Sequence, residues 1–111
     1  MQLGLYSAAS ADYANAMGIY SAASADYANA IGSYANASAA YSVALGSLSV
    51  ADREAGMAGY DPVTGDKSAD ESSVWKANAG AVSIGSSADG EENYPQITNV
   101  AAGTEDTDAV N

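Results

Sequence analysis

The sequence predicts an all-β protein, a parallel β-solenoid with coils of 14 residues. The first observation is that eleven residues, YSAASADYANA, occupy positions 6–16 and recur unchanged at positions 20–30. The second is a glycine at every fourteenth position, namely Gly4, Gly18, Gly32 and Gly46. The third is a regular alternation of small residues with other residues. Stacked coils place each repeat in the same environment, which explains why the sequence repeats itself.

The alternation of small residues predicts two strands in each coil. In every seven-residue half, three positions spaced by two hold only Ala, Ser or Gly, starting with Ser7, Ala9 and Ala11, and the pattern ends at Arg53. Spacing by two is the periodicity of a strand, whereas the seam of a coiled coil alternates between three and four. We therefore expect strands of roughly five residues joined by turns of about two. The small side chains would fill a thin interior between two layers of strands.

The outward-facing positions divide into a polar face and an apolar face. One face holds only small and polar side chains, among them Ser10, Ser24 and Ser38. The opposite face carries larger apolar side chains that recur every 14 residues. An exposed column of this kind needs a cover, and we expect further copies of the chain to provide it. The predicted interface residues are Met17, Ile31, Val43, Leu45, Val82 and Ile84.

A tyrosine stands before each predicted strand, at every seventh position. Consecutive tyrosines fall on opposite edges of the roll, so two ladders of stacked rings are expected. Stacked rings would shield the edges of the coils, which is a structural role, but exposed tyrosine is also suited to recognition. The candidate ligand surface therefore comprises Tyr6, Tyr13, Tyr20, Tyr27, Tyr34 and Tyr41 together with Ser10, Ser24 and Ser38.

Four segments are expected along the chain. Residues 1–52 form the repeats, and residues 53–80 form a polar insertion with a turn or hairpin at DPVTGD. Residues 81–95 contain AVSIG, which alternates as the repeats do and predicts a last coil and a connection. Residues 96–111 form a separate C-terminal segment. Trp75 is expected to anchor the insertion against its neighbours.

Composition excludes several classes of function. The net charge is −11, with three basic residues against fourteen acidic ones, which disfavours nucleic acid and anionic membrane surfaces as partners. Histidine and cysteine are both absent, so neither Ser–His nor Cys–His catalysis is available. The sequence therefore predicts no enzyme, no catalytic residues, no cofactor and no metal site. Weak calcium binding at Asp61, Asp66, Asp70 or Glu71 stays an open alternative.

The run QITNVAAGTEDTDAVN, residues 96–111, resembles the neck of YadA-like trimeric autotransporter adhesins. The repeats resemble the head motif of that family, in which S-x-A-x-G rungs alternate with A-x-A-x-G rungs. The resemblance implies a left-handed parallel β-roll, a homotrimer, and a neck that leads to a coiled-coil stalk. It also implies an extracellular head on the outer membrane of a Gram-negative bacterium, with a C-terminal membrane anchor beyond Asn111.

Two positions depart from the family's pattern. Many family repeats have Gly where this chain has Ala11, Ala25 and Ala39, so these turns are expected to differ in conformation. Pro95 replaces a basic residue that usually precedes the neck.

The resemblance implies a surface adhesin that attaches to host matrix proteins, cells, glycans or bacterial surface receptors. A passive spacer without a ligand of its own would have the same shape. An ice-binding solenoid is a third alternative, but such proteins display rows of threonine, and the four threonines here all follow residue 60.

Overall fold

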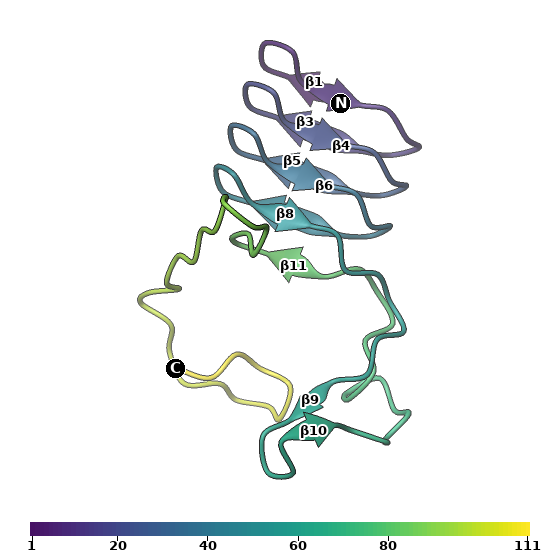
Figure 1. Ribbon diagram of the computed structural model, residues 1–111, viewed down its shortest axis with the longest axis vertical. Coiled ribbons are helices and arrows are strands. Elements are labelled where there is room, and N and C mark those ends of the chain that lie inside the picture. Colours follow the sequence, from purple (N-terminus) through teal and green to yellow (C-terminus); the bar gives the residue numbers. More distant parts are fainter.

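The computed structural model describes residues 1–111 and consists of short strands stacked into a roll, followed by extended segments (Figure 1). It has no helix long and apolar enough to cross a membrane. Consecutive coils lie one above the other, and each coil contributes one strand to each of two layers. The predicted fold class, an all-β parallel solenoid, is confirmed.

The first layer is a five-stranded parallel sheet in the order β1-β3-β5-β7-β11. Its register advances by one 14-residue repeat per strand, because Ala16 pairs with Ala30, and Ala30 with Ala44. Identical positions of successive repeats therefore stack directly on each other. The strands are β1 (Gln2–Leu3), β3 (Asn15–Met17), β5 (Asn29–Ile31), β7 (Val43–Leu45) and β11 (Val82–Ser83).

The second layer is a four-stranded parallel sheet in the order β2-β4-β6-β8, with the same register. Its strands are only two residues long, and those of the first layer have two or three, so the expected length of about five is wrong. The turns take up the remaining residues, although backbone pairing between coils continues through them. The strands are β2 (Ala8–Ala9), β4 (Ala22–Ala23), β6 (Asn36–Ala37) and β8 (Val50–Ala51).

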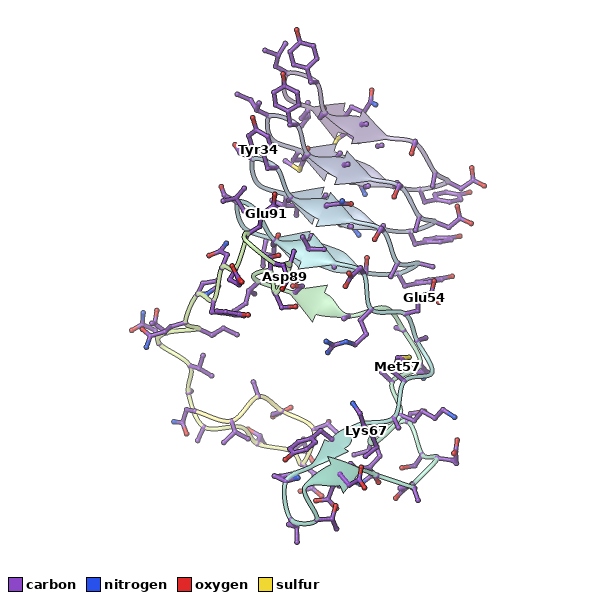
Figure 2. The ribbon with its side chains drawn as sticks, in the orientation of Figure 1. Tyr34, Glu54, Met57, Lys67, Asp89 and Glu91 are labelled. Carbon is purple, nitrogen blue, oxygen red and sulfur yellow. The ribbon has the colours of Figure 1, made fainter.

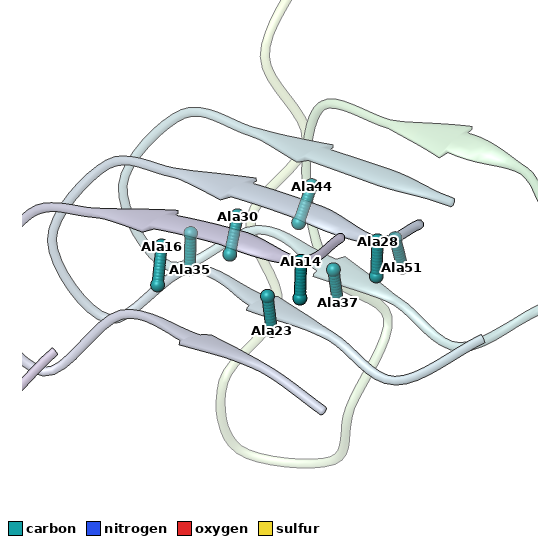
Figure 3. Close-up of a cluster of buried hydrophobic side chains, with 9 residues drawn as sticks. All are labelled: Ala14, Ala16, Ala23, Ala28, Ala30, Ala35, Ala37, Ala44 and Ala51. Atoms are coloured by element: carbon teal, nitrogen blue, oxygen red, sulfur yellow. The ribbon is translucent and has the colours of Figure 1, made fainter. Parts of the chain in front are cut away.

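The interior between the layers is made of alanine and serine. Figure 3 shows the cluster of buried alanines. Ten alanines and four serines are buried, and all but Ser86 occupy positions that the alternation assigned to the interior. The buried serine hydroxyls find backbone carbonyls, since Ser21 Oγ donates to Gly18 O at 2.8 Å and Ser49 Oγ donates to Gly46 O at 2.7 Å, whereas Ser42 Oγ donates to Ala51 O at 3.4 Å. The prediction of a thin, small-residue interior is confirmed.

The two edges of the roll turn differently. At one edge a glycine with φ between 115° and 129° begins each turn, and a residue in the left-handed region follows two residues later, a tyrosine in the first three turns and Leu48 after Gly46. At the other edge Ala11, Ala25 and Ala39 replace the glycine, and none of them has positive φ. The six tyrosines of both edges share a left-handed backbone with φ between 57° and 62°. The two edges of this chain therefore differ in backbone conformation where glycine is exchanged for alanine.

The insertion leaves the roll after β8 and returns beside the point where it left (Figure 1). Its two arms are paired by backbone hydrogen bonds, from Ala81 N to Arg53 O at 3.0 Å and from Gly56 N to Ala77 O at 2.8 Å. The far end is an antiparallel hairpin of β9 (Tyr60–Asp61) and β10 (Asp66–Lys67).

Beyond the insertion the chain rejoins the first layer. In β11, Val82 pairs in parallel with Val43 of β7, so this strand takes the next place in the stack. Ser86 and Asn93 then exchange two backbone hydrogen bonds of 2.8 and 2.9 Å around a turn at Gly90. The Asn93 side chain ties this turn to the roll by donating to Ser47 O at 3.0 Å.

We expect the substitution Gly32→Ala to destabilise the roll strongly. The added Cβ would lie 2.5 Å from the carbonyl carbon of Gly46, at a φ of +129° that disfavours any side chain. The free energy of unfolding should fall by about 1–3 kcal/mol from backbone strain alone. A urea titration followed by circular dichroism would measure it. The control is Gly56→Ala, where φ is +88° but nothing lies within 4 Å. Equal losses at the two positions would contradict the close approach of stacked glycines.

Candidate interaction surfaces

The outer face of the first layer carries a continuous column of apolar side chains, here called the apolar column. The register stacks Leu3 on Met17, Met17 on Ile31 and Ile31 on Leu45, and Ile84 follows Ser83, which pairs with Ala44. The column is open to solvent, since Leu3 is 52% exposed and Leu45 is 47% exposed. Five strands therefore present one uninterrupted apolar stripe.

A second column on the same face changes character along the roll. It begins with Asn15 and Asn29, whose side chains are joined by a hydrogen bond of 2.8 Å, and continues with Val43 and Val82. The amide ladder satisfies the polar side chains of the first coils. All six predicted interface residues thus lie on one face of one sheet, with the greater apolar area toward β11.

Sequence reasoning missed four exposed apolar residues, of which Leu3 belongs to the apolar column and the other three lie in the turns. Leu3, Leu5, Ile19 and Leu48 are 46–63% exposed. The repeat held the signal for all of them. Leu3 precedes Met17 by 14 residues, Leu5 and Ile19 occupy equivalent turns, and Leu48 occupies the place that Tyr34 has one coil earlier.

The tyrosines form two ladders, one at each edge, as predicted. Tyr6, Tyr20 and Tyr34 stack with ring centroids 5.0 and 5.2 Å apart. We call these the glycine-edge ladder, and Figure 2 shows Tyr34 at that edge of the roll. The alanine-edge ladder consists of Tyr13, Tyr27 and Tyr41, with separations of 4.9 and 4.7 Å.

The rings of both ladders are nearly parallel and accessible. The interplanar angles lie between 7° and 21°. The exposed fraction runs from 44% at Tyr27 to 75% at Tyr13, so every ring shields its neighbour while keeping one side in solvent.

The polar face lies on the second layer. Ser10, Ser24 and Ser38 are exposed at equivalent positions of successive coils, and Asp52 continues the row. Their backbone groups are occupied by pairing between coils, as in the 3.0 Å bond from Ser24 N to Ala37 O. This face therefore offers hydroxyl groups, and its one larger apolar side chain is Val50 of β8, which stacks on Asn36.

Two aspartates of the insertion accept hydrogen bonds from backbone amides in the turns that contain them. Asp61 Oδ1 accepts the Val63 amide at 2.9 Å, and Asp70 Oδ1 accepts the Ser72 amide at 2.9 Å. The hydrogen bonds from the backbone and hydroxyl of Ser72 lower the pKa of the Asp70 carboxyl. The structure gathers no group of three or more acidic, histidine or cysteine side chains that could hold a metal ion.

Trp75 lies where the two arms of the insertion meet. Its carbonyl accepts the Gly59 amide at 2.6 Å, and a Cβ at Gly59 would lie 2.6 Å from the Trp75 carbonyl oxygen and 3.5 Å from Trp75 Cε3, so the backbones approach closely and the ring is in ordinary contact. Next to it, Lys76 Nζ contacts Glu71 Oε2 at 2.6 Å. These contacts give Trp75 the anchoring position that the sequence suggested for it.

A hollow of about 440 Å³ lies at the end of the roll where the last coil closes. It is lined by residues 50–53 of the second layer, by residues 81–88 and by residues 93–95. The hollow marks the place where a further coil would stack, and Pro95, the departure from the family's pattern, lies on its wall.

The C-terminal segment, residues 96–111, leaves the roll without forming strands (Figure 1). Its local order comes from a turn in which Asp108 Oδ2 accepts the amides of Thr104 and Glu105 at 2.7 and 3.0 Å. These backbone hydrogen bonds, that of Glu105 first, lower the pKa of the Asp108 carboxyl.

Comparison with known proteins agrees with this geometry. Residues 96–111 match the family described as the coiled stalk of trimeric autotransporter adhesins. Over 63 residues, 57% of this chain, the sequence is 59% identical to the autotransporter adhesin BadA of Bartonella henselae. Both findings support a YadA-like trimeric autotransporter adhesin.

The resemblance read from the repeats and from residues 96–111 is thereby confirmed. The matched stretch spans 2% of the length of BadA.

We expect the turn at residues 104–108 to loosen in acid. The folded pKa of Asp108 lies below its ordinary value of 3.8, so the carboxylate stabilises the turn above that value and ceases to do so as the pH falls through the folded pKa. Carboxyl chemical shifts followed by nuclear magnetic resonance should show Asp108 protonating below 3.8. The protection of the Thr104 amide against exchange, taken relative to its intrinsic exchange rate at each pH, should fall over the same range. The variant Asp108→Asn should remove this pH dependence, and its persistence there would contradict the assignment.

Proposed function

We propose that this chain is part of the head of a bacterial surface adhesin, and that it functions as a homotrimer. The observation that carries the proposal is the exposed apolar column on β1, β3, β5, β7 and β11. Within the chain the column has no cover, as the 52% exposure of Leu3 and the 47% exposure of Leu45 indicate. A soluble protein covers such a stripe by association.

The composition of the interior supports association. Alanine and serine bury little apolar area, so a single roll gains much less from the hydrophobic effect than a domain with leucine and phenylalanine in its core. Burying the column between copies would add the missing area. Three rolls related by a threefold axis would bring equivalent residues together around one closed interface.

The position of the C-terminal segment indicates which end of the roll would point toward the bacterial membrane. Residues 96–111, similar to an adhesin stalk, leave the roll beyond its last coil. We assign residues 1–52 and 81–95 to the head, residues 53–80 to an insertion, and residues 96–111 to the neck. In this arrangement the stalk and membrane anchor follow residue 111, and the head projects from the outer membrane of a Gram-negative bacterium.

The outward surfaces are the candidate ligand sites. The serine row at Ser10, Ser24 and Ser38 and the tyrosine ladders stay accessible when the apolar column is covered at its own face. Host matrix proteins, glycans or bacterial surface receptors are the proposed partners. Flat rows of hydroxyl groups and exposed aromatic rings are both suited to such recognition.

The double variant Ile31→Asp and Leu45→Asp should abolish the trimer. Two carboxylates per chain would be placed where the copies meet, and burying unpaired charges is costly. Light scattering would report the change in mass. The matched control is Ser24→Asp and Ser38→Asp, which adds the same charges to the polar face and should leave the trimer intact. A folded trimer that survives the first pair would overturn the assigned interface.

Binding by the purified trimer separates an adhesin head from a passive spacer. Immobilised matrix proteins, a glycan array and whole bacterial surfaces would be screened with the fluorescently labelled trimer. Replacing Ser10, Ser24 and Ser38 by Glu should lower the affinity for a ligand of the polar face by about tenfold or more, which corresponds to the loss of one interfacial hot spot. If this variant keeps the mass of the trimer, the lost affinity reflects the changed polar face and not a disrupted assembly. A trimer that binds none of the surfaces favours the spacer.

A further inference from the structure

The tyrosine ladders place chemically reactive rings at a fixed and repeated spacing. Four pairs stack with centroids between 4.7 and 5.2 Å and with interplanar angles of 7° to 21°. Each ring also keeps between 44% and 75% of its surface exposed. Close pairing and access to solvent together are what a bimolecular coupling of phenols requires.

We propose that both ladders are sites of oxidative cross-linking, at which tyrosines of neighbouring coils become joined by dityrosine bonds within one chain. The pairs are residues 14 apart, such as Tyr13 with Tyr27 and Tyr20 with Tyr34. This property concerns the single roll, so it stands whether or not the chain is a trimer.

The backbone holds each pair in place. Tyr27 N donates to Asp12 O at 2.9 Å and Tyr41 N donates to Asp26 O at 3.0 Å, so the residue before each tyrosine of one coil is bonded to the tyrosine of the next. All six tyrosines share nearly the same φ, and their rings stack along each edge. Equivalent ring carbons therefore face each other along the ladder.

The reaction balances with hydrogen peroxide and a haem peroxidase as the oxidant. Each of two phenols gives up one electron and one proton to become a phenoxyl radical. The radicals couple through the ring carbons next to the hydroxyl groups, forming one carbon–carbon bond. The two hydrogens on those carbons move to the oxygens and restore both phenols. Two hydrogens are thereby lost in total, and one hydrogen peroxide becomes two waters.

A cross-link of this kind would tie one coil to the next without changing the register. It closes a loop of one repeat and so restricts the unfolded chain, as a disulfide of the same span does. The chain has no cysteine and therefore no disulfide to serve this purpose. We expect the midpoint of urea unfolding to rise after oxidation.

The test is treatment of the full chain with a haem peroxidase and hydrogen peroxide. Dityrosine would be read by its blue fluorescence and by a mass lower by two hydrogen atoms for each bond. The double variant Tyr20→Phe and Tyr27→Phe removes all four stacked tyrosine pairs but keeps aromatic rings in both ladders. The remaining ladder tyrosines are two coils, about 10 Å, apart. This variant should lose nearly all of the product.

Matched controls separate geometry from the number of tyrosines. The variant Tyr60→Phe and Tyr94→Phe also removes two exposed tyrosines, 61% and 73% exposed, but neither stacks on another ring, so its yield should equal that of the unaltered chain. Each single change, Tyr20→Phe or Tyr27→Phe, should leave half of the product, because two stacked pairs remain. In concentrated urea the two double variants should give equal yields.

Three results would overturn the proposal. The first is a folded Tyr20→Phe and Tyr27→Phe variant that forms as much dityrosine as the unaltered chain. The second is a product that migrates on a denaturing gel as joined chains rather than as one chain. The third is a loss of product in the Tyr60→Phe and Tyr94→Phe variant equal to that in the ladder variant. Circular dichroism would establish that each variant is folded.

Discussion

The narrow gap between the two strand layers is the constraint on which the structure depends. A β-carbon at an inward position meets the opposite layer directly, so only alanine, serine or glycine fits there. This restriction produces the alternation in the sequence and fixes the 14-residue coil. It also removes the usual source of stability, because small side chains bury little apolar surface. Contacts on the outside of the roll compensate for the small apolar area buried in the interior.

Two kinds of contact on the outside supply what the interior lacks. Stacked tyrosines join successive coils at both edges, and the pair Asn15 and Asn29 joins two of them on the outer face. The ring contacts offset the strain of six tyrosines held in the left-handed region. The apolar column is the second kind of contact, and it would add apolar burial between rolls when copies of the chain associate. A thin solenoid places its larger hydrophobic residues outside, where they act between chains.

Periodicity made the repeats predictable, since every position could be checked against its copy 14 residues away. The buried set, both ladders and the face of Met17, Ile31 and Leu45 followed from this alone. Strand length was overestimated, because the left-handed tyrosines extend the turns and no alternation rule reports backbone φ. The pairing of the insertion's arms and the turn around Asp108 have no repeat to reveal them, and they depend on single contacts such as Gly59 with Trp75.

The paired base of the insertion has a consequence for how such chains diversify. The hydrogen bond from Ala81 N to Arg53 O brings the exit and the re-entry points together, and β11 then stacks on β7 as if nothing intervened. The length and content of residues 54–80 are thereby uncoupled from the geometry of the coils. Substitutions, insertions and deletions within residues 54–80 can therefore accumulate without changing how the coils on either side stack.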